Sequence, residues 1–435
     1  MVLLGADCVE ITRVRVDGGE TVLWVQTPDA QRVLCGACGV RARSKGRREV
    51  RLRDAPGRDG GVCEVRWRKR IWWCPNAGCE TRTWTEECEL AAPRRVLTCR
   101  AEQWAAARLE AVEGSVASTA RRLGVAWATV WSAVAAWACQ VVGDPGRVGP
   151  VARLGLDETV MRSASRLARR RYVSAAVDAA TGQVIDIFDG RNAADLHRWL
   201  EQQPAGWLAA IEVVCCDPHE GYRSGITRAR RDTHLSDSVK IAADAFGIVR
   251  LANQALDGAR RRVHNETTGR RGRKGDPLYH ARKLLLTGAE RLDAAGWDKM
   301  LAALDAADPT DEIRECWVAK EHVRDIFRAD DPLDAQQHLN EAIAWCEHPS
   351  APPELATLAR TLRRWHTEIA TAVRTRTSNA RTEAANARIN HVKRSARGFR
   401  NLHNYRLRIL LAAGRQPCQT QPVTPIRTRR PSLVA

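Results

Sequence analysis

The sequence predicts a multidomain α/β protein with an N-terminal cysteine ribbon, a helix-turn-helix and a mixed-sheet core that carries a large helical insertion. Three observations predict this organisation: two cysteine pairs near the start, a helical pattern broken by one glycine, and short apolar runs from residue 153 onward. With 435 residues, the chain is long enough for about two to four domains of ordinary size.

The composition is that of a folded, strongly basic protein. Sixty-nine Lys and Arg residues against 51 Asp and Glu residues leave a formal charge of +18, beside 44% hydrophobic residues. This balance excludes a disordered or collagen-like chain. Because the basic residues are clustered, the charge favours a polyanionic partner such as nucleic acid over solubility alone.

The sequence has no pattern typical of a membrane or secreted protein. No run reaches the roughly 18 apolar residues of a membrane span, and Asp7 and Glu10 follow Met1–Leu4 before a signal-peptide core can form. We therefore expect a soluble, cytoplasmic protein that associates with the nucleoid and has no membrane partner.

Four cysteines in two pairs are the candidate metal ligands: Cys35 with Cys38, and Cys74 with Cys79. Glycines and a proline beside them predict two tight knuckles. Four thiolates suit a tetrahedral structural Zn²⁺, and since the first histidine is His197, the site has to be all-cysteine. The second pair is one residue wider than in the commonest ribbon, so buried structural cysteines are the alternative.

Residues 115–137 have the spacing of a helix-turn-helix. Ala120 is a small residue where the helices touch, Gly124 forms the turn, and Val130 anchors the second helix. That second helix begins near Trp127, and we expect Trp127 and Thr129 to contact DNA. An ordinary helical hairpin is the alternative.

A Gly- and Pro-rich linker at 142–150 precedes a pattern of short strands. Three antiparallel strands are expected first, followed by alternating helices and strands, which makes a mixed sheet resembling the ribonuclease H (RNase H) fold. The expected strands are 154–157, 172–178, 184–188, 211–216 and 239–243, with helices at 192–203 and 219–230.

The remaining chain is expected to be helical. The composition of 246–376 predicts no strand, and a helix capped by Asn379 is expected to end near Gly398. The expected domains are a zinc-binding domain at 1–95, a helix-turn-helix domain at 96–142, the first part of the core at 151–245, the insertion at 246–376, the last core helices at 377–414 and a disordered basic tail at 415–435.

Three acids are the candidate catalytic residues and ligands of two Mg²⁺ or Mn²⁺ ions. Asp157 ends the first core strand, Asp217 follows the fourth, and Glu383 lies on a late helix. Neighbouring strand ends meet at one edge, where carboxylates from separate elements can hold two ions for attack on a phosphodiester. Ordinary surface carboxylates are the alternative, but Asp217 closes an apolar run and Glu383 shares a helix face with two asparagines.

Clustered basic residues are the further candidate DNA contacts, because arginine and lysine bind phosphates without reading sequence. These residues are Arg260, Arg261, Arg262, Arg270, Arg271, Arg273, Lys274, Lys393 and Arg394.

Several motifs together resemble bacterial insertion-sequence DDE transposases of the ISL3 type, in the right order from about residue 33 to 414. The segments that carry the resemblance are Cys74–Glu86, Gly155–Glu158, Cys216–Tyr222, Arg260–Tyr279, Ser378–Asn386 and Arg397–Asn401.

The resemblance implies a zinc-binding N-terminal domain, a helix-turn-helix that grips terminal inverted repeats, and an RNase H-like core. Asp157, Asp217 and Glu383 would be its catalytic triad. It also implies 3′-end nicking, strand transfer into target double-stranded DNA, and a homo-oligomer on that DNA. One departure is clear: such proteins often have Asp-x-Phe-His after the fifth strand, where this chain has Asp244 and Gly247.

Two other classes of function fit part of the pattern. A zinc-ribbon and helix-turn-helix regulator would need no acidic triad. An RNase H-like nuclease would share the acids but would need no module that recognises DNA ends. An inactive copy of the element is a third alternative.

Overall fold

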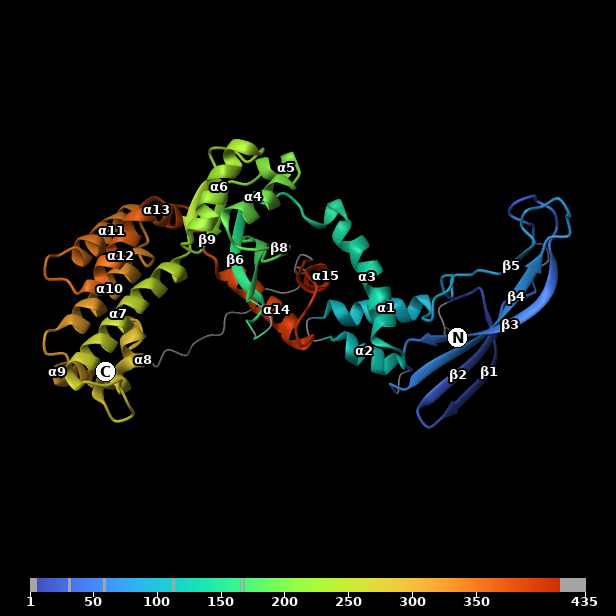
Figure 1. Cartoon of the computed structure of the whole chain (residues 1–435), viewed down its shortest axis with the longest axis horizontal. Coiled ribbons are helices and arrows are strands. Elements are labelled where there is room, and N and C mark those ends of the chain that lie inside the picture. Colours follow the sequence, from blue (N-terminus) through green and yellow to red (C-terminus); the bar gives the residue numbers. More distant parts are fainter. Residues whose placement is uncertain are drawn as a thin grey trace, which may run out of the picture.

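A computed structural model describes residues 6–29, 33–57, 60–111, 114–164, 166 and 169–414 of the protein. The expected basic tail at 415–435 and the segment Met1–Leu4 lie outside the described residues. In Figure 1 the chain forms an elongated series: an N-terminal sheet at one end, a small helical unit, a central sheet with helices, and a helical bundle at the other end.

The N-terminal part is a five-stranded sheet in the order β1-β2-β4-β3, with β5 paired to β4. β2 and β4 are parallel and the other neighbours are antiparallel. The sequence predicted a cysteine ribbon here but not a sheet of this size. The strands are β1 (Glu10–Asp17), β2 (Glu20–Gln26), β3 (Arg43–Asp54), β4 (Val62–Trp73) and β5 (Thr83–Thr85).

The helix-turn-helix is confirmed in α1 (Cys99–Glu110), α2 (Val116–Leu123) and α3 (Trp127–Gly143). Gly124 ends α2 in the left-handed conformation at φ 63°, which glycine adopts without steric cost. α2 and α3 meet at 114°, and Ala120 and Val130 are buried between them. Among the described residues no single helix has the length and apolarity of a bilayer span, although α2 and α3 pass that test as a bent pair.

The central sheet has the order β10-β9-β6-β7-β8. β6, β7 and β8 are antiparallel, while β9 runs parallel to β6 and β10 parallel to β9, so the predicted mixed sheet is confirmed. A one-turn helix η1 (Pro145–Arg147) precedes it. The strands are β6 (Arg153–Arg162), β7 (Arg171–Asp178), β8 (Val184–Asp189), β9 (Val213–Cys216) and β10 (Lys240–Ala243).

Helices cover both faces of this sheet (Figure 1). On one face, apolar side chains of α4 (Ala193–Glu201), α5 (Ala205–Ala209) and α6 (Glu220–Asp232) pack on Leu156 and Val214. On the other, α14 (Ala380–Ser395) and α15 (Leu402–Ala413) pack on β7 and β8. Residues separated by more than 200 positions in sequence therefore share one core.

Between β10 and α14 the described residues form helices joined by loops and contain no strand, as the sequence predicts. Its apolar side chains form a core of their own, and α13 also covers the edge strand β10. The helices are α7 (Ala245–Thr268), α8 (Pro277–Leu286), η2 (Ala289–Arg291), α9 (Ala294–Ala307), α10 (Glu312–Ile326), α11 (Pro332–Cys346), α12 (Pro353–Arg364) and α13 (His366–Thr375).

The helix-turn-helix is fixed to the central sheet through α15. Leu407 and Leu411 of α15 are buried in the core of the helix-turn-helix. Beside them Arg408 is only 3% exposed and donates hydrogen bonds to the carbonyls of Ala111 (3.3 Å) and Gly114 (2.7 Å), just before α2. Burial lowers the pKa of Arg408 to about 10. This buried contact sets the position of α2 and α3 relative to the core.

Candidate active site

Three aspartates lie in a row at the edge of the central sheet where β9 and β10 end. The expectation that Asp157 ends its strand is wrong, because β6 continues to Arg162. In the registers of β6 with β9 and β9 with β10, Leu156 is opposite Cys216 and Cys216 is opposite Ala243. The next residue along each of these parallel strands is an aspartate: Asp157, Asp217 and Asp244. Asp157 and Asp217 are therefore neighbours in this row, and Asp244 extends it.

Gly155 lets α14 approach this edge. A Cβ at position 155 would lie 2.1 Å from Thr382 Oγ1, a distance that no packed side chain tolerates. The close approach places Glu383, the residue after Thr382, beside the row of aspartates. One turn further along α14, Asn386 Nδ2 donates to Asp157 Oδ2 at 2.5 Å.

Asp244 joins the two helices that complete the site. Its carboxylate accepts the backbone N–H of Gly247 at 2.9 Å and that of Asn379 at 3.2 Å. The first bond caps α7 and the second holds the start of α14. The expectation that the Asn379 side chain caps α14 is wrong: Asn379 stands at the cap position, but its side chain accepts no capping hydrogen bond.

Gly247 occupies the position where similar sequences often have histidine. A Cβ there would lie 2.6 Å from Pro218 Cδ and 3.0 Å from Asp217 Oδ1. The first turn of α7 therefore packs directly on the segment that carries Asp217, and this chain has no room for an imidazole at position 247.

Burial and neighbouring acids raise the pKa values of Asp157 and Glu383. Burial, and after it the charge of Asp217, raises the pKa of Asp157 to about 7, against the hydrogen bonds from Glu158 N–H and Asn386. Burial also raises the pKa of Glu383, with further contributions from Asp244 and Asp217. Arg250 faces the cluster and donates to Asp217 Oδ2 at 2.8 Å. Among the described residues, it is the one cationic side chain that forms an ion pair with any of these four acids.

The donor set suits a hard divalent cation. All candidate ligand atoms are carboxylate oxygens, which Mg²⁺ and Mn²⁺ prefer, and an added cation would relieve the raised pKa values. The three acids are not drawn into one tight cluster. In the described part of the chain, the four cysteines alone form a group of three or more whose ligand atoms all lie within 4.8 Å of one another.

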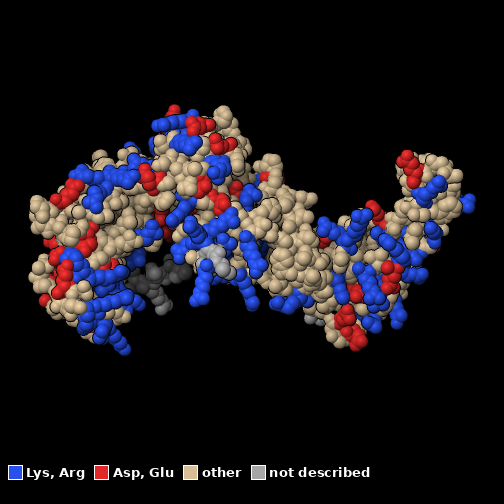
Figure 2. Space-filling model, in the orientation of Figure 1, with Lys and Arg blue, Asp and Glu red and all other residues tan. Residues whose placement is uncertain are grey.

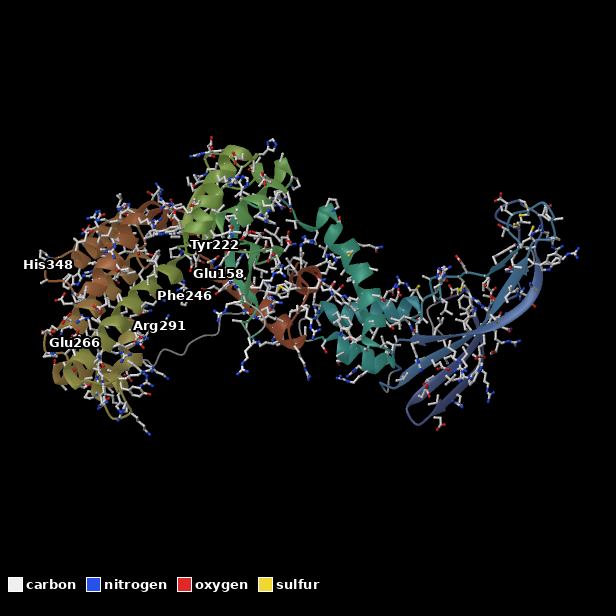
Figure 3. All side chains as sticks on the ribbon, viewed as in Figure 1. Glu158, Tyr222, Phe246, Glu266, Arg291 and His348 are labelled. Carbon is white, nitrogen blue, oxygen red and sulfur yellow. The ribbon has the colours of Figure 1, made fainter. Side chains whose placement is uncertain are left out.

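Glu158, although next to Asp157, faces the other side of the sheet. It pairs with Arg191 through both carboxylate oxygens at 2.9 Å, and the Arg191 guanidinium lies 3.9 Å from the centre of the Tyr172 ring. Figure 3 labels Glu158 on β6 and Phe246 at the start of α7. Sequence reasoning missed Arg191.

The four cysteines meet at the open end of the β3–β4 hairpin, where β3 begins and β4 ends. Their Sγ atoms all lie within 4.8 Å of one another, with 3.8 Å between Cys35 and Cys79 and 3.5 Å between Cys38 and Cys74. Four sulfurs about 2.3 Å from a tetrahedral zinc ion are about 3.8 Å apart. A hydrogen bond with the Val40 backbone lowers the pKa of Cys38 to about 7, while burial raises the pKa of Cys79 to about 12. The cluster has the geometry of a zinc site.

The basic residues expected on the insertion are partly held in ion pairs. Arg262 bonds Glu312 and Glu354, Arg260 and Arg261 share Asp257, and Arg270 bonds Asp276. Glu354 and Glu312 raise the pKa of Arg262, so its role is at least partly structural.

The arginines of the first cluster, Arg260 to Arg262, line a groove of about 870 Å³ together with Arg271, Arg282 and Lys283. The sequence prediction omitted Arg282 and Lys283, although two consecutive basic residues could have indicated a further phosphate contact. Arg273 and Lys274 are exposed in the loop before α8.

On the helix-turn-helix, Trp127 is 51% exposed and Thr129 is half-buried, so the structure leaves the first turn of α3 accessible. On α14, Lys393 Nζ donates to the Val160 carbonyl at 2.6 Å, whereas Arg394 is exposed.

Two family models match the chain. One, described as transposase, covers residues 154–409, which contain all three acids. The other, described as the helix-turn-helix domain of transposase family ISL3, covers residues 86–138. No curated protein matches the chain. Since the first model spans more than half of the sequence and the second covers the DNA-binding helices, the chain belongs to the ISL3 family of transposases.

Proposed function

We propose that this transposase cuts the ends of its insertion sequence and joins them to target DNA through metal-dependent chemistry at Asp157, Asp217 and Glu383. The observation that carries the proposal is the placement of Asp157 and Asp217 at adjacent strand registers, with α14 held to Asp157 by Asn386 and with Asp217 acting on Glu383. The order β10-β9-β6-β7-β8, with three antiparallel strands followed by two parallel ones, supports an RNase H-like core.

Two Mg²⁺ or Mn²⁺ ions at this edge would activate the attacking hydroxyl and stabilise the leaving oxygen. Asp157 and Asp217 would hold them from the sheet, and Glu383 would close the site from α14. Asn386 keeps the Asp157 carboxylate oriented. Asp244 is a positioning residue, because it fixes the starts of α7 and α14 through two backbone hydrogen bonds.

The four cysteines are proposed to bind one structural Zn²⁺, on the evidence of their convergence and their sulfur spacing. The N-terminal sheet and the helix-turn-helix would then recognise the terminal inverted repeats, while exposed basic residues on the insertion and on α14 bind phosphates. Because an insertion sequence has two ends, we propose that at least two copies of the chain assemble on the DNA.

The test is cleavage of duplexes taken from the two ends of the element that carries this reading frame. The full chain should nick them at the element boundary with Mg²⁺ or Mn²⁺ and should not do so in EDTA. Nicking that persists in EDTA after removal of bound metal would contradict metal-dependent chemistry at the acids.

A further inference from the structure

A groove lies between the helix-turn-helix and the loop that follows α14. It has a volume of about 520 Å³, and we call it the junction groove. One wall comes from α2 and α3 and the other from residues 396–401. Its principal side chains are Arg121, Trp127, Trp131, Arg397, Phe399 and Arg400.

The junction groove continues along the catalytic core. A second hollow of about 570 Å³ shares Arg397 and Arg400 with it and extends to Arg162, Lys393 and Arg394. Lys393 and Arg394 lie on the last turn of α14, the helix that carries Glu383. The two hollows therefore make one track from the helix-turn-helix toward the acids.

The track is uniformly basic. Neither hollow is lined by an acidic side chain among the described residues, and in that part of the chain Arg397 and Arg400 form no ion pair and are exposed. The groove on the insertion differs, because Asp257 lines it and pairs with its arginines. Figure 2 shows Lys and Arg gathered on the lower side of the central part of the molecule, below α14 in the view of Figure 1.

The occupant that fits this track is double-stranded DNA. In a helix-turn-helix the first residues of the second helix meet base edges in the major groove, and here that turn presents Trp127, stacked at 6.0 Å on Trp131. A sugar-phosphate strand beside the bases read by α3 meets Arg397 and Arg400. Arginine binds phosphate oxygens through two parallel N–H groups.

The part of the track along α14 has a length that the helix geometry gives. Glu383 and Arg394 are eleven positions apart on one α-helix, which is about 16 Å at 1.5 Å per residue. At about 3.4 Å per base pair, this corresponds to about five base pairs. The distance is fixed because buried Arg408 and the leucines of α15 hold the helix-turn-helix on the core.

We propose that the junction groove seats the backbone of the element-end duplex next to the bases read by α3 and directs it along α14 toward the acids, with Arg394 about five base pairs from Glu383. This inference rests on the proposed function. It makes the catalytic core a contributor to end binding through Arg397 and Arg400.

The test compares Arg397→Gln/Arg400→Gln with a matched pair of exposed arginines on the opposite face of the sheet, Arg198→Gln/Arg231→Gln. Both are made in the Asp157→Asn chain, so that bound duplex is not cut. The probes are duplexes from the element ends and an unrelated duplex, examined by titration at several salt concentrations and by hydroxyl-radical footprinting.

The junction-groove pair should reduce the slope of log K against log salt by about 1.8 and weaken binding about tenfold per arginine at 0.1 M salt. The loss should be equal for end and unrelated duplexes, because phosphate contacts carry no sequence information. Protection should disappear only from the few phosphates between the bases read by α3 and the cleavage point. Trp127→Ala should instead reduce discrimination between the two duplexes.

An unchanged salt slope and footprint in Arg397→Gln/Arg400→Gln would overturn the junction groove, as would an equal loss in Arg198→Gln/Arg231→Gln. Failure of the proposed function would appear elsewhere: the chain with intact Asp157 would bind the end duplex, with the same footprint, and would not cut it in Mg²⁺.

Discussion

The surroundings of Asp157 disfavour the ionised form of its carboxyl group. Burial and the neighbouring Asp217 raise its pKa to about 7, although Asn386 and the Glu158 N–H bind the ionised form. A folded protein that holds this proton more tightly than the unfolded chain loses stability as the pH rises from about 4 to about 7. The ionised site costs folding energy that a bound cation would offset.

We predict that, without divalent metal, Asp157→Asn is more stable than the wild type at pH 8, because the amide keeps an acceptor for Asn386 and carries no charge. The difference should be about 2–4 kcal/mol, from the size of the pKa shift. It should shrink as the pH falls through 7 toward 4, and also when Mg²⁺ is added at pH 8. Urea unfolding at several pH values measures it, and a difference independent of pH would contradict the raised pKa.

The residues of the site differ in how far the sequence predicts them. Asp157 and Asp217 are predictable because each ends an apolar run, and Glu383 because polar residues share its helix face. The role of Asp244 cannot be predicted from the sequence. Its carboxylate accepts hydrogen bonds from Gly247 and from Asn379, and Asn379 is 135 positions away. Asp244 is 3% exposed, so Asp244→Ala removes a buried group that caps α7.

At the scale of elements, the approach of α14 to β6 builds the site. Thr382 Oγ1 would be 2.1 Å from a Cβ on residue 155, whereas Thr382 Cβ would be 3.4 Å from it. The hydroxyl of Thr382 is thus the atom that excludes a side chain at position 155.

We predict that Gly155→Ala moves α14 away from β6 and lowers cleavage by at least about tenfold, while end binding is kept. Adding Thr382→Ala should restore most of the activity, because the clashing oxygen is gone. Cleavage rates of the two single variants and the double variant form the cycle. If the double variant were no better than Gly155→Ala, the packing of α14 on Gly155 would not explain the loss.

The cysteine cluster is an element-scale feature as well, since it joins the loop before β3 to the loop after β4. We predict one Zn²⁺ per chain by elemental analysis, and its loss in Cys35→Ser with loosening of the N-terminal sheet, because metal binding and folding share free energy. Cys139→Ser is the control, as Cys139 is exposed on α3. Full zinc content in Cys35→Ser would contradict the assignment.

The N-terminal sheet shows why strands can be missed in a basic sequence. In β4 (VCEVRWRKRIWW), Val65 and Trp67 are buried, but Arg and Lys interrupt the apolar pattern. Aromatic rings shelter some of these charges: Lys69 Nζ lies 4.4 Å from the centre of the Trp67 ring. The interrupted pattern therefore does not indicate β3 and β4, although each has 12 residues.

At the scale of the whole molecule, the helix-turn-helix and the candidate catalytic acids are built on one scaffold. The helix-turn-helix packs on α15 and the acids lie beside α14, and both helices cover the same face of the central sheet. The bundle from α7 to α13 leaves this sheet directly after Asp244. The order of these units follows from the sequence, but the contact of Arg408 with the segment before α2 does not, because 294 positions separate Arg408 from Gly114.

The central claim is that Asp157, Asp217 and Glu383 perform the chemistry and do not recognise the DNA ends. It is tested most directly by measuring end binding, nicking and joining by Asp157→Asn, Asp217→Asn and Glu383→Gln, with Glu158→Gln as the control that faces the other side of the sheet. We predict that each of the first three loses at least about a hundredfold in nicking and joining with Mg²⁺ and binds end duplexes like the wild type, while Glu158→Gln stays active. Near-normal joining by Glu383→Gln, or loss of end binding in all three variants, would contradict the account.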